Sequence, residues 1–220
     1  MTEVGIRRVS APELAAHALL AIDTSLGTSV ALGSGATITE VWSDDPRGHA
    51  EVIGTLIARV FAEHGVDPAA VTGVVAGMGP GPFTGLRVGI AAAHAFALGR
   101  GLATLPVISH DAVALEALET GAVAGIRVVQ DAKRRELFVT DYAGLDWAGI
   151  PERTGSPRLE PREGFAAVAN ELWPERVPAA SLVRLAARRL GAGRDFEADQ
   201  ALYLRLPDVM QPKAPKPVTP

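Results

Sequence analysis

The chain has 220 residues, of which 48% are hydrophobic and 21% charged, a composition typical of a folded domain rather than of a disordered chain. It contains no cysteine, which excludes disulfides and thiolate chemistry and fits a reducing compartment. The formal net charge of −4 argues against independent binding of nucleic acid through a broad positive field. No apolar run approaches the roughly 18 residues of a membrane span, and Glu3, Glu13 and His17 interrupt any signal-peptide core. We therefore expect a cytoplasmic protein.

The first half of the chain predicts an antiparallel meander followed by alternating helices and strands. Residues 1–17 show no alternation, and we expect a loose extension with at most a short helix over 11–18. After it, hydrophobic periodicity and turn signals predict strands at 19–23, 29–33, 37–42, 73–78 and 102–108, and helices at 50–64, 85–98 and from 109 or 111 to about 121. Thr84 is the expected cap of the helix that begins at Gly85.

The second half repeats the pattern in a shorter form. We predict a hairpin of strands at 126–131 and 136–142, a Gly/Pro-rich connection over 143–161, helices at 163–172 and 180–190, and an unpacked proline-rich end over 211–220. The repeated order favours two related α/β lobes with mixed sheets. We divide the chain into an N-terminal extension (1–17), a first lobe (18–122), a reduced second lobe whose last helix packs back (123–207) and a Pro-rich tail (208–220).

A cleft between two such lobes would hold any ligand, and three residues at a strand end are candidates for it. Asp23, Thr24 and Ser25 could present backbone N–H groups to a phosphate while the carboxylate holds a metal. Asp131, at the matching end of the second-lobe hairpin, could join them. The alternative is that both segments are ordinary hairpin turns whose polar groups satisfy the local backbone, and short motifs of this kind often mislead.

The segment from Gly79 to Gly89 reads Gly-Pro-Gly-Pro-Phe-Thr-Gly-Leu-Arg-Val-Gly. Glycines before a helix let backbone donors approach an anion, but its two prolines remove two N–H groups and stiffen the loop. The lysine of a P-loop is missing. We therefore expect this segment to shape a rigid strand-to-helix turn.

The sequence gives little support for a metal site or for a basic surface that binds nucleic acid. His49 lacks a second ligand one turn later, because position 53 is Ile, so we predict no metal centre. Arg184, Arg188 and Arg189 are expected on the solvated face of the last helix, with a minor contact to tRNA as the alternative.

Several segments together resemble the TsaB family. They are Leu20 to Ser25, His49-Ala50-Glu51, Gly79 to Gly89, the hairpin from Asp131 to Phe138, and Tyr203-Leu204-Arg205. The resemblance covers residues 19–142 firmly and 180–207 more loosely. It implies an α/β, two-lobed, actin-like ATPase (ASKHA) fold with a reduced second lobe. The extension before Leu19 is longer than is usual in the family, and residues 142–180 match it poorly.

The resemblance also implies a function. TsaB proteins assemble with TsaD and TsaE, which transfer threonylcarbamoyl to an adenosine of tRNA, and TsaD carries the His-x-x-x-His metal pair that this chain lacks at His49 and Ile53. The chain is thus expected to be a non-catalytic scaffold or activator that forms a heterodimer with TsaD, a homodimer when alone, and contacts tRNA only through the complex. It would hold no cofactor of its own, with ATP or ADP only at the TsaD interface. The residues that the family places at this interface lie on the two first-lobe helices: Val52, Leu56, Arg59, Val60, Arg87, Ile90, Ala91 and His94.

Two other hypotheses stay open at this stage. One is a small ATPase or phosphotransferase of the same fold that uses Asp23 and Asp131 around a magnesium nucleotide. The other, much weaker, is a metal-dependent peptidase. Even the smooth, alanine-rich helix at 85–98 is open to two interpretations, because it could be buried within its own lobe or packed against a partner.

Overall fold

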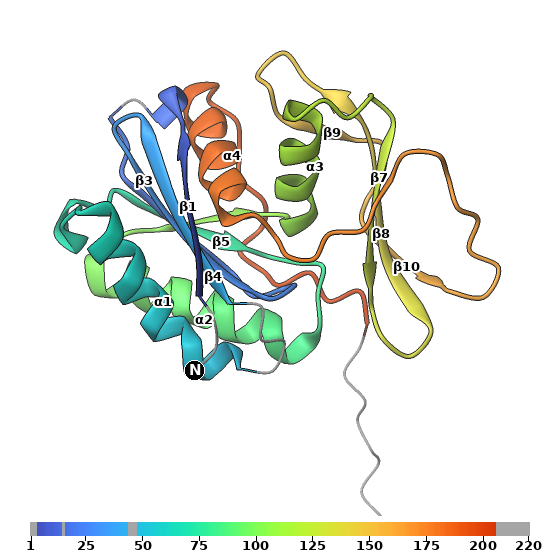
Figure 1. The fold of residues 1–220 in the computed structure, drawn as a ribbon, viewed down its shortest axis with the longest axis horizontal. Coiled ribbons are helices and arrows are strands. Elements are labelled where there is room, and N and C mark those ends of the chain that lie inside the picture. Colours follow the sequence, from blue (N-terminus) through green and yellow to red (C-terminus); the bar gives the residue numbers. More distant parts are fainter. Residues whose placement is uncertain (1–3, 15, 44–47, 206–220) are drawn as a thin grey trace, which may run out of the picture.

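The computed structural model describes residues 4–14, 16–43 and 48–205, and its strands form two sheets (Figure 1). The first sheet has six strands in the order β1-β4-β3-β2-β5-β6. These strands are β1 (Val4–Ser10), β2 (Leu19–Asp23), β3 (Thr28–Ser34), β4 (Thr37–Ser43), β5 (Gly73–Gly77) and β6 (Thr104–Val107). The predicted meander is antiparallel, whereas β5 and β6 extend the sheet in parallel.

Helices cover both faces of the first sheet. On one face lie α1 (His49–His64) and α2 (Phe83–Arg100), and on the other lies α4 (Ala179–Gly191), with the short η1 (Pro12–Leu14) beside it (Figure 1). A short turn, η2 (Pro68–Ala70), precedes β5. The helix α3 (Ser109–Glu119) lies between α4 and the second sheet. None of the helices in the described ranges is both long and apolar enough to cross a membrane.

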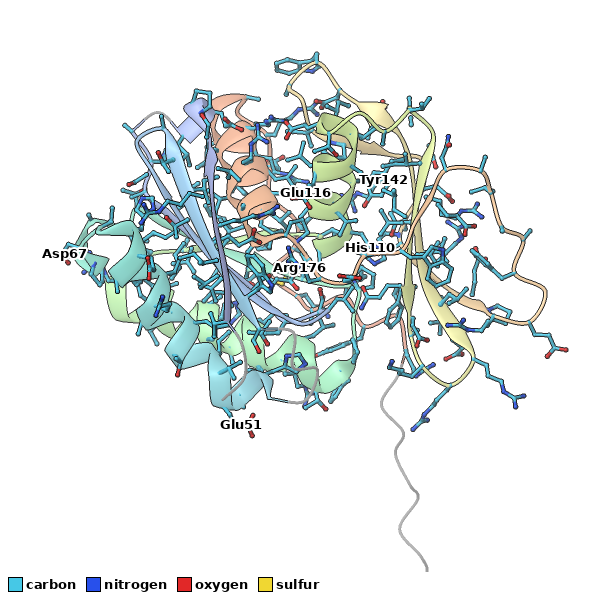
Figure 2. The ribbon with its side chains drawn as sticks, in the orientation of Figure 1. Glu51, Asp67, His110, Glu116, Tyr142 and Arg176 are labelled. Atoms are coloured by element: carbon cyan, nitrogen blue, oxygen red, sulfur yellow. The ribbon has the colours of Figure 1, made fainter. Side chains whose placement is uncertain are left out.

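The second sheet is smaller and is built on one long hairpin. Its path is β10-β8-β7-β11, with β9 paired to β8. These strands are β7 (Ile126–Asp131), β8 (Glu136–Leu145), β9 (Pro151–Arg153), β10 (Arg158–Pro161) and β11 (Glu171–Leu172). Tyr142 and His110 are both fully buried between α3 and this sheet (Figure 2).

The prediction that residues 1–17 are loose is wrong for most of the segment. Residues 4–10 form the edge strand β1, which pairs with β4 over its whole length, and Arg7 binds the buried carboxylate of Glu40. The strand escapes sequence patterning because its polarity does not follow its burial: Gly5 and Arg7 are half-buried, whereas Val4 and Ile6 are exposed. Of the short helix predicted over 11–18, only the three-residue η1 is present.

Two predictions in the second half are also wrong. The connection over 143–161 contains the strands β9 and β10, which hydrogen-bond to β8. The helix predicted at 163–172 is absent, and that stretch is a mostly exposed loop ending in β11. Its alanines have helical propensity, but no apolar face is buried there, and short helices depend on such burial. The proline-rich tail (208–220) lies outside the described residues.

Candidate functional site

The turn after β2 is buried and internally satisfied. Asp23 Oδ1 accepts hydrogen bonds from Ser25 N (2.8 Å) and Ser25 Oγ (2.6 Å). Its Oδ2 accepts one from Ser109 Oγ at 2.5 Å. Burial raises the pKa of Asp23, and these hydrogen bonds only partly oppose the rise. A carboxylate whose two oxygens are both bonded inside the protein is poorly placed to hold a metal-bound nucleotide.

Thr24 joins this turn to the start of α2. Its Oγ1 donates to Gly85 O (2.6 Å) and accepts from Gly89 N (2.9 Å). A Cβ at Gly89 would lie 2.2 Å from Thr24 Oγ1, and one at Gly85 would lie 2.6 Å from Thr24 O. The glycines therefore allow α2 to pack directly on the turn, which leaves no space for a phosphate between them. Thr84 does not cap α2, because the helix already begins at Phe83, after Pro82.

Asp131 takes no part in this arrangement. Its side chain is 44% exposed at the hairpin turn, where it pairs with Lys133 and Arg162. Burial alone would raise the pKa of Asp131, but hydrogen bonds from Lys133 and Arg162 and the charge of Lys133 lower it overall. These partners belong to the second lobe, whereas Asp23 is bonded to Ser25 and Ser109. The two carboxylates thus lie in separate hydrogen-bond networks, and their pairing across the lobes stays a prediction.

A polar chain that sequence reasoning missed connects the two lobes instead. Gln130 Nε2 donates to Ser25 O at 2.8 Å, and Gln130 Oε1 lies 3.2 Å from His110 Nε2. The other ring nitrogen of His110 lies 2.8 Å from Thr140 Oγ1. Burial lowers the pKa of His110 to about 4, which keeps the ring neutral at pH 7. The sequence feature that could have revealed this polar chain is Gln130, a polar residue at an inward position of a strand, next to Asp131.

The α1–α2 surface contains six of the eight predicted interface residues. Arg59, Arg87 and Ala91 are exposed, and the partly buried ones are Val52, Ile90 and His94. The other two predictions are wrong, because Leu56 and Val60 are fully buried in the core beneath α1 and are inaccessible to a partner. Leu98, which was not predicted, is the most exposed large apolar side chain on α2, at 83%.

The C-terminal segment crosses one side of α2. Asp199 Oδ1 lies 2.8 Å from His94 Nε2, and Arg87 Nε donates to Tyr203 Oη at 3.1 Å. The Tyr203 ring packs on Phe83 with 4.8 Å between ring centroids. The chain thus covers His94 and Arg87 in part, while Ala91 and Leu98 stay uncovered.

Basic side chains on α4 are occupied within the protein. Arg184 and Arg188 form ion pairs with Glu13 and Glu119, and the nearly buried Arg189 pairs with Glu197. The predicted solvated face is therefore wrong for these three arginines, and the alternative tRNA contact stays a prediction. His49 Nδ1 lies 2.7 Å from Thr28 Oγ1. Within the described parts of the chain, no group of three His, Asp or Glu side chains is arranged to hold a metal ion.

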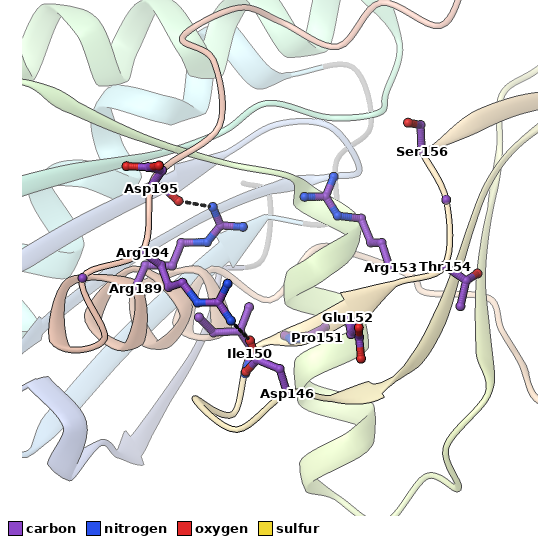
Figure 3. Close-up of a pocket in the computed structure, with 12 residues that line it drawn as sticks. Asp146, Ile150, Pro151, Glu152, Arg153, Thr154, Ser156, Arg189, Arg194 and Asp195 are labelled. Carbon is purple, nitrogen blue, oxygen red and sulfur yellow. Dashed lines mark hydrogen bonds and ion pairs between the residues drawn. The ribbon is translucent and has the colours of Figure 1, made fainter.

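A cavity of about 740 Å³ lies beside α4 and β9, and Asp23 is not among the residues that line it (Figure 3). Its arginines are paired, since Arg194 binds Asp146 (2.7 Å) and Arg153 binds Glu197. Nearby Asp111 is buried with Tyr142 Oη donating to it at 2.9 Å, and burial raises its pKa to about 6 despite the facing arginines. Carboxylates and guanidinium groups thus neutralise one another along this wall.

Comparisons with known proteins connect the chain with the TsaD and TsaB families. The family described as "TsaD: tRNA N6-adenosine threonylcarbamoyltransferase" matches residues 43–147. An uncharacterized protein of Mycobacterium tuberculosis is 34% identical over 142 residues, covering 64% of this chain and 62% of the relative. The tRNA threonylcarbamoyladenosine biosynthesis protein TsaB of Escherichia coli is 30% identical over 125 residues (56% and 54%), and that of Haemophilus influenzae 33% over 121 residues (54% and 51%). The chain thus matches between half and two thirds of the length of these relatives.

Solved structures extend the likeness to most of the fold. A Pseudomonas aeruginosa protein described as similar to peptidase YEAZ superposes with a TM-score of 0.73 at 28% identity, covering 86% of this chain and all of that one. A structure of YeaZ from the same organism gives 0.73 at 25% identity. The fold is that of a two-lobed, actin-like α/β protein with mixed sheets. Within that class, the chain is similar to TsaB and YeaZ proteins and, over residues 43–147, to the TsaD family.

Proposed function

We propose that this chain is a non-catalytic subunit of a complex that synthesises threonylcarbamoyladenosine in tRNA, and that it binds a TsaD-type transferase subunit. One observation carries the proposal: the turn at Asp23 is closed by its own hydrogen bonds, while α1 and α2 still offer an exposed surface. The names of the E. coli and H. influenzae relatives supply the pathway.

The α1–α2 surface suits a partner that packs closely. Ala91 and Ala95 are exposed and small, and Leu98 projects from the same helix. Small residues allow another helix to approach, and an exposed apolar side chain gains free energy when a partner covers it. The same surface would form a homodimer when the transferase subunit is absent. TsaE would join the assembly, and ATP or ADP would be held only at the joint interface, because Asp23 is already engaged.

The alternative hypotheses gain no support. An ATPase that uses Asp23 and Asp131 would need the two carboxylates to face one nucleotide, and they lie in separate networks. A peptidase would need a metal or nucleophile arrangement, and the described residues offer no metal cluster. The likeness to a peptidase that is stated for one Pseudomonas aeruginosa structure belongs to that protein and does not carry over to this chain.

The proposal is tested by co-purification with a TsaD-type protein from the same source. We expect the wild-type pair to elute as one species at micromolar concentration, and Ala91→Glu to weaken the association at least tenfold by burying a charge in the interface. Ala124→Glu is the matched control, since Ala124 is exposed on a loop before β7. Separate elution of the wild-type proteins, or equal effects of the two substitutions, would refute the proposed interface.

A further inference from the structure

The turn between β7 and β8 has an unusual backbone. Lys133, Arg134 and Arg135 are consecutive and all have positive φ, at 62°, 52° and 63°. Side chains with a Cβ rarely adopt this conformation, which glycine or asparagine would accept at little cost. The sequence nevertheless has three long cationic side chains here, and all three residues are exposed. Strained backbone that carries one kind of side chain is a reason to look for a function.

The C-terminal segment holds this turn in place. The guanidinium group of Arg205 donates to Ala132 O (3.1 Å) and Lys133 O (3.2 Å) and forms an ion pair with Glu136. Glu136 N also donates to Lys133 O at 3.0 Å. The turn projects from the end of the second sheet in Figure 1. Its cations are therefore presented by a fixed backbone, which reduces the entropy lost on binding a ligand.

Charge accumulates around the turn although the chain as a whole is acidic. Arg162 lies beside it, and the one carboxylate of Asp131 serves both Arg162 and Lys133, each at 3.2 Å. The half-exposed ring of Trp173 lies next to this group, with the Arg162 guanidinium 5.9 Å from its centroid. Cations beside an exposed aromatic ring are the combination that contacts phosphates and stacks on unpaired bases of RNA.

We infer that Lys133, Arg134 and Arg135, here called the tip cations, contact the phosphate backbone of the tRNA bound by the complex. The inference rests on the proposed function, since that function brings tRNA to the chain. It also assigns the tRNA contact to the hairpin, where cations are exposed, instead of to α4, where they are paired internally.

The test compares two triple variants in complex with the transferase subunit. One is Lys133→Gln, Arg134→Gln and Arg135→Gln, and the control is Arg8→Gln, Arg100→Gln and Arg194→Gln, three exposed arginines outside the second sheet. Both remove three positive charges. Binding of an unmodified tRNA transcript is measured between about 50 and 200 mM salt. We expect the tip variant to bind about tenfold more weakly at low salt and to reduce the slope of log Kd against log salt by about 2, while the control changes little.

A second variant separates binding from folding. Arg134→Gly removes one cation and also places glycine at a positive φ, so we expect a higher melting temperature together with weaker tRNA binding. A misfolded variant would not melt later. Association with the transferase subunit is measured in parallel and should be unchanged in every variant.

Three results would overturn the inference. The tip variant could bind tRNA as the wild type does, the control could lose as much affinity, or the tip variant could lose affinity only for anionic phospholipid vesicles. If instead the wild-type chain fails to join the transferase subunit, the proposed function itself fails, and this inference fails with it.

Discussion

Individual glycines decide how closely α2 approaches the turn at Thr24. We predict that Gly89→Ala lowers the free energy of unfolding by about 2–3 kcal/mol, because the new Cβ would lie 2.2 Å from Thr24 Oγ1 and displace its hydrogen bond to Gly89 N. Urea denaturation measures the change.

The control lies in the same helix. Gly99 has nothing within 4 Å of an added Cβ, so Gly99→Ala should stabilise the protein by up to about 1 kcal/mol through helix propensity alone. If both substitutions changed stability in the same direction by similar amounts, the close packing of α2 on Thr24 would not be a source of stability.

The adjacent His110 and Asp111 are predicted to have opposite effects on stability as pH changes. Burial lowers the pKa of His110 to about 4, so between about 6.5 and 4 the unfolded chain binds more protons and acid removes stability, by about 3 kcal/mol in all. Burial raises the pKa of Asp111 to about 6, so between about 6 and 4 the folded chain binds more protons and acid adds stability.

Single substitutions separate the two effects. The stability advantage of the wild type over His110→Gln should shrink as pH falls from about 7 to 4, whereas its advantage over Asp111→Asn should grow across the acid half of that range. Denaturant titrations at several pH values provide the measurement. Parallel pH profiles for the wild type and both variants would contradict these pKa directions.

At the scale of elements, the N-terminal strand is an integral part of the first sheet. Arg7 on β1 pairs with Glu40, whose side chain is fully buried, and burial raises the pKa of Glu40 against the opposing effect of Arg7. We predict that Arg7→Ala destabilises the protein by about 2–4 kcal/mol, because it leaves that carboxylate without its counter-ion.

The neighbouring Arg8 gives the comparison. Its side chain is 59% exposed, so Arg8→Ala should cost less than about 1 kcal/mol. Adding Glu40→Gln to Arg7→Ala should restore part of the loss, since the buried charge is then gone. Equal losses at Arg7 and Arg8 in chemical denaturation would mean that β1 contributes no specific ion pair.

Element prediction succeeded where burial leaves a pattern in the sequence. The strands β2, β3, β4, β5 and β7 have mostly buried residues between clear turn signals. By contrast, β9 and β10 are short and half-exposed, so they depend on pairing with β8 that is invisible in their own residues. At 163–172 the residues have helix propensity but no buried apolar face, so the predicted helix does not form.

At the scale of the whole molecule, the sequence predicted some parts of the candidate site and missed others. The family resemblance proposed Arg59, Arg87 and Ala91 for the α1–α2 surface, and all three are exposed there. It did not place Leu56 and Val60 correctly, because an apolar stripe does not by itself tell whether it packs on the chain's own sheet or on a partner. Contacts between distant segments, such as Gln130 with Ser25, follow from topology and leave no local signal.

At the scale of the whole molecule, hydrogen bonds join the two lobes to each other. Hydrogen bonds link Ser25, Gln130 and His110 across the lobes, and the C-terminal segment runs from α2 to the β7–β8 turn through Tyr203 and Arg205. This arrangement suits the proposed role of a subunit that supports a partner's chemistry.

Reconstitution of tRNA modification tests this account most directly. Threonylcarbamoyladenosine is measured in an unmodified tRNA transcript after incubation with TsaD- and TsaE-type proteins, with the chain added, omitted, or replaced by Ala91→Glu. The account predicts product only with the wild-type chain present, strongly reduced product with Ala91→Glu, and none from the chain alone. Undiminished modification without the chain, or turnover by the chain by itself, would contradict it.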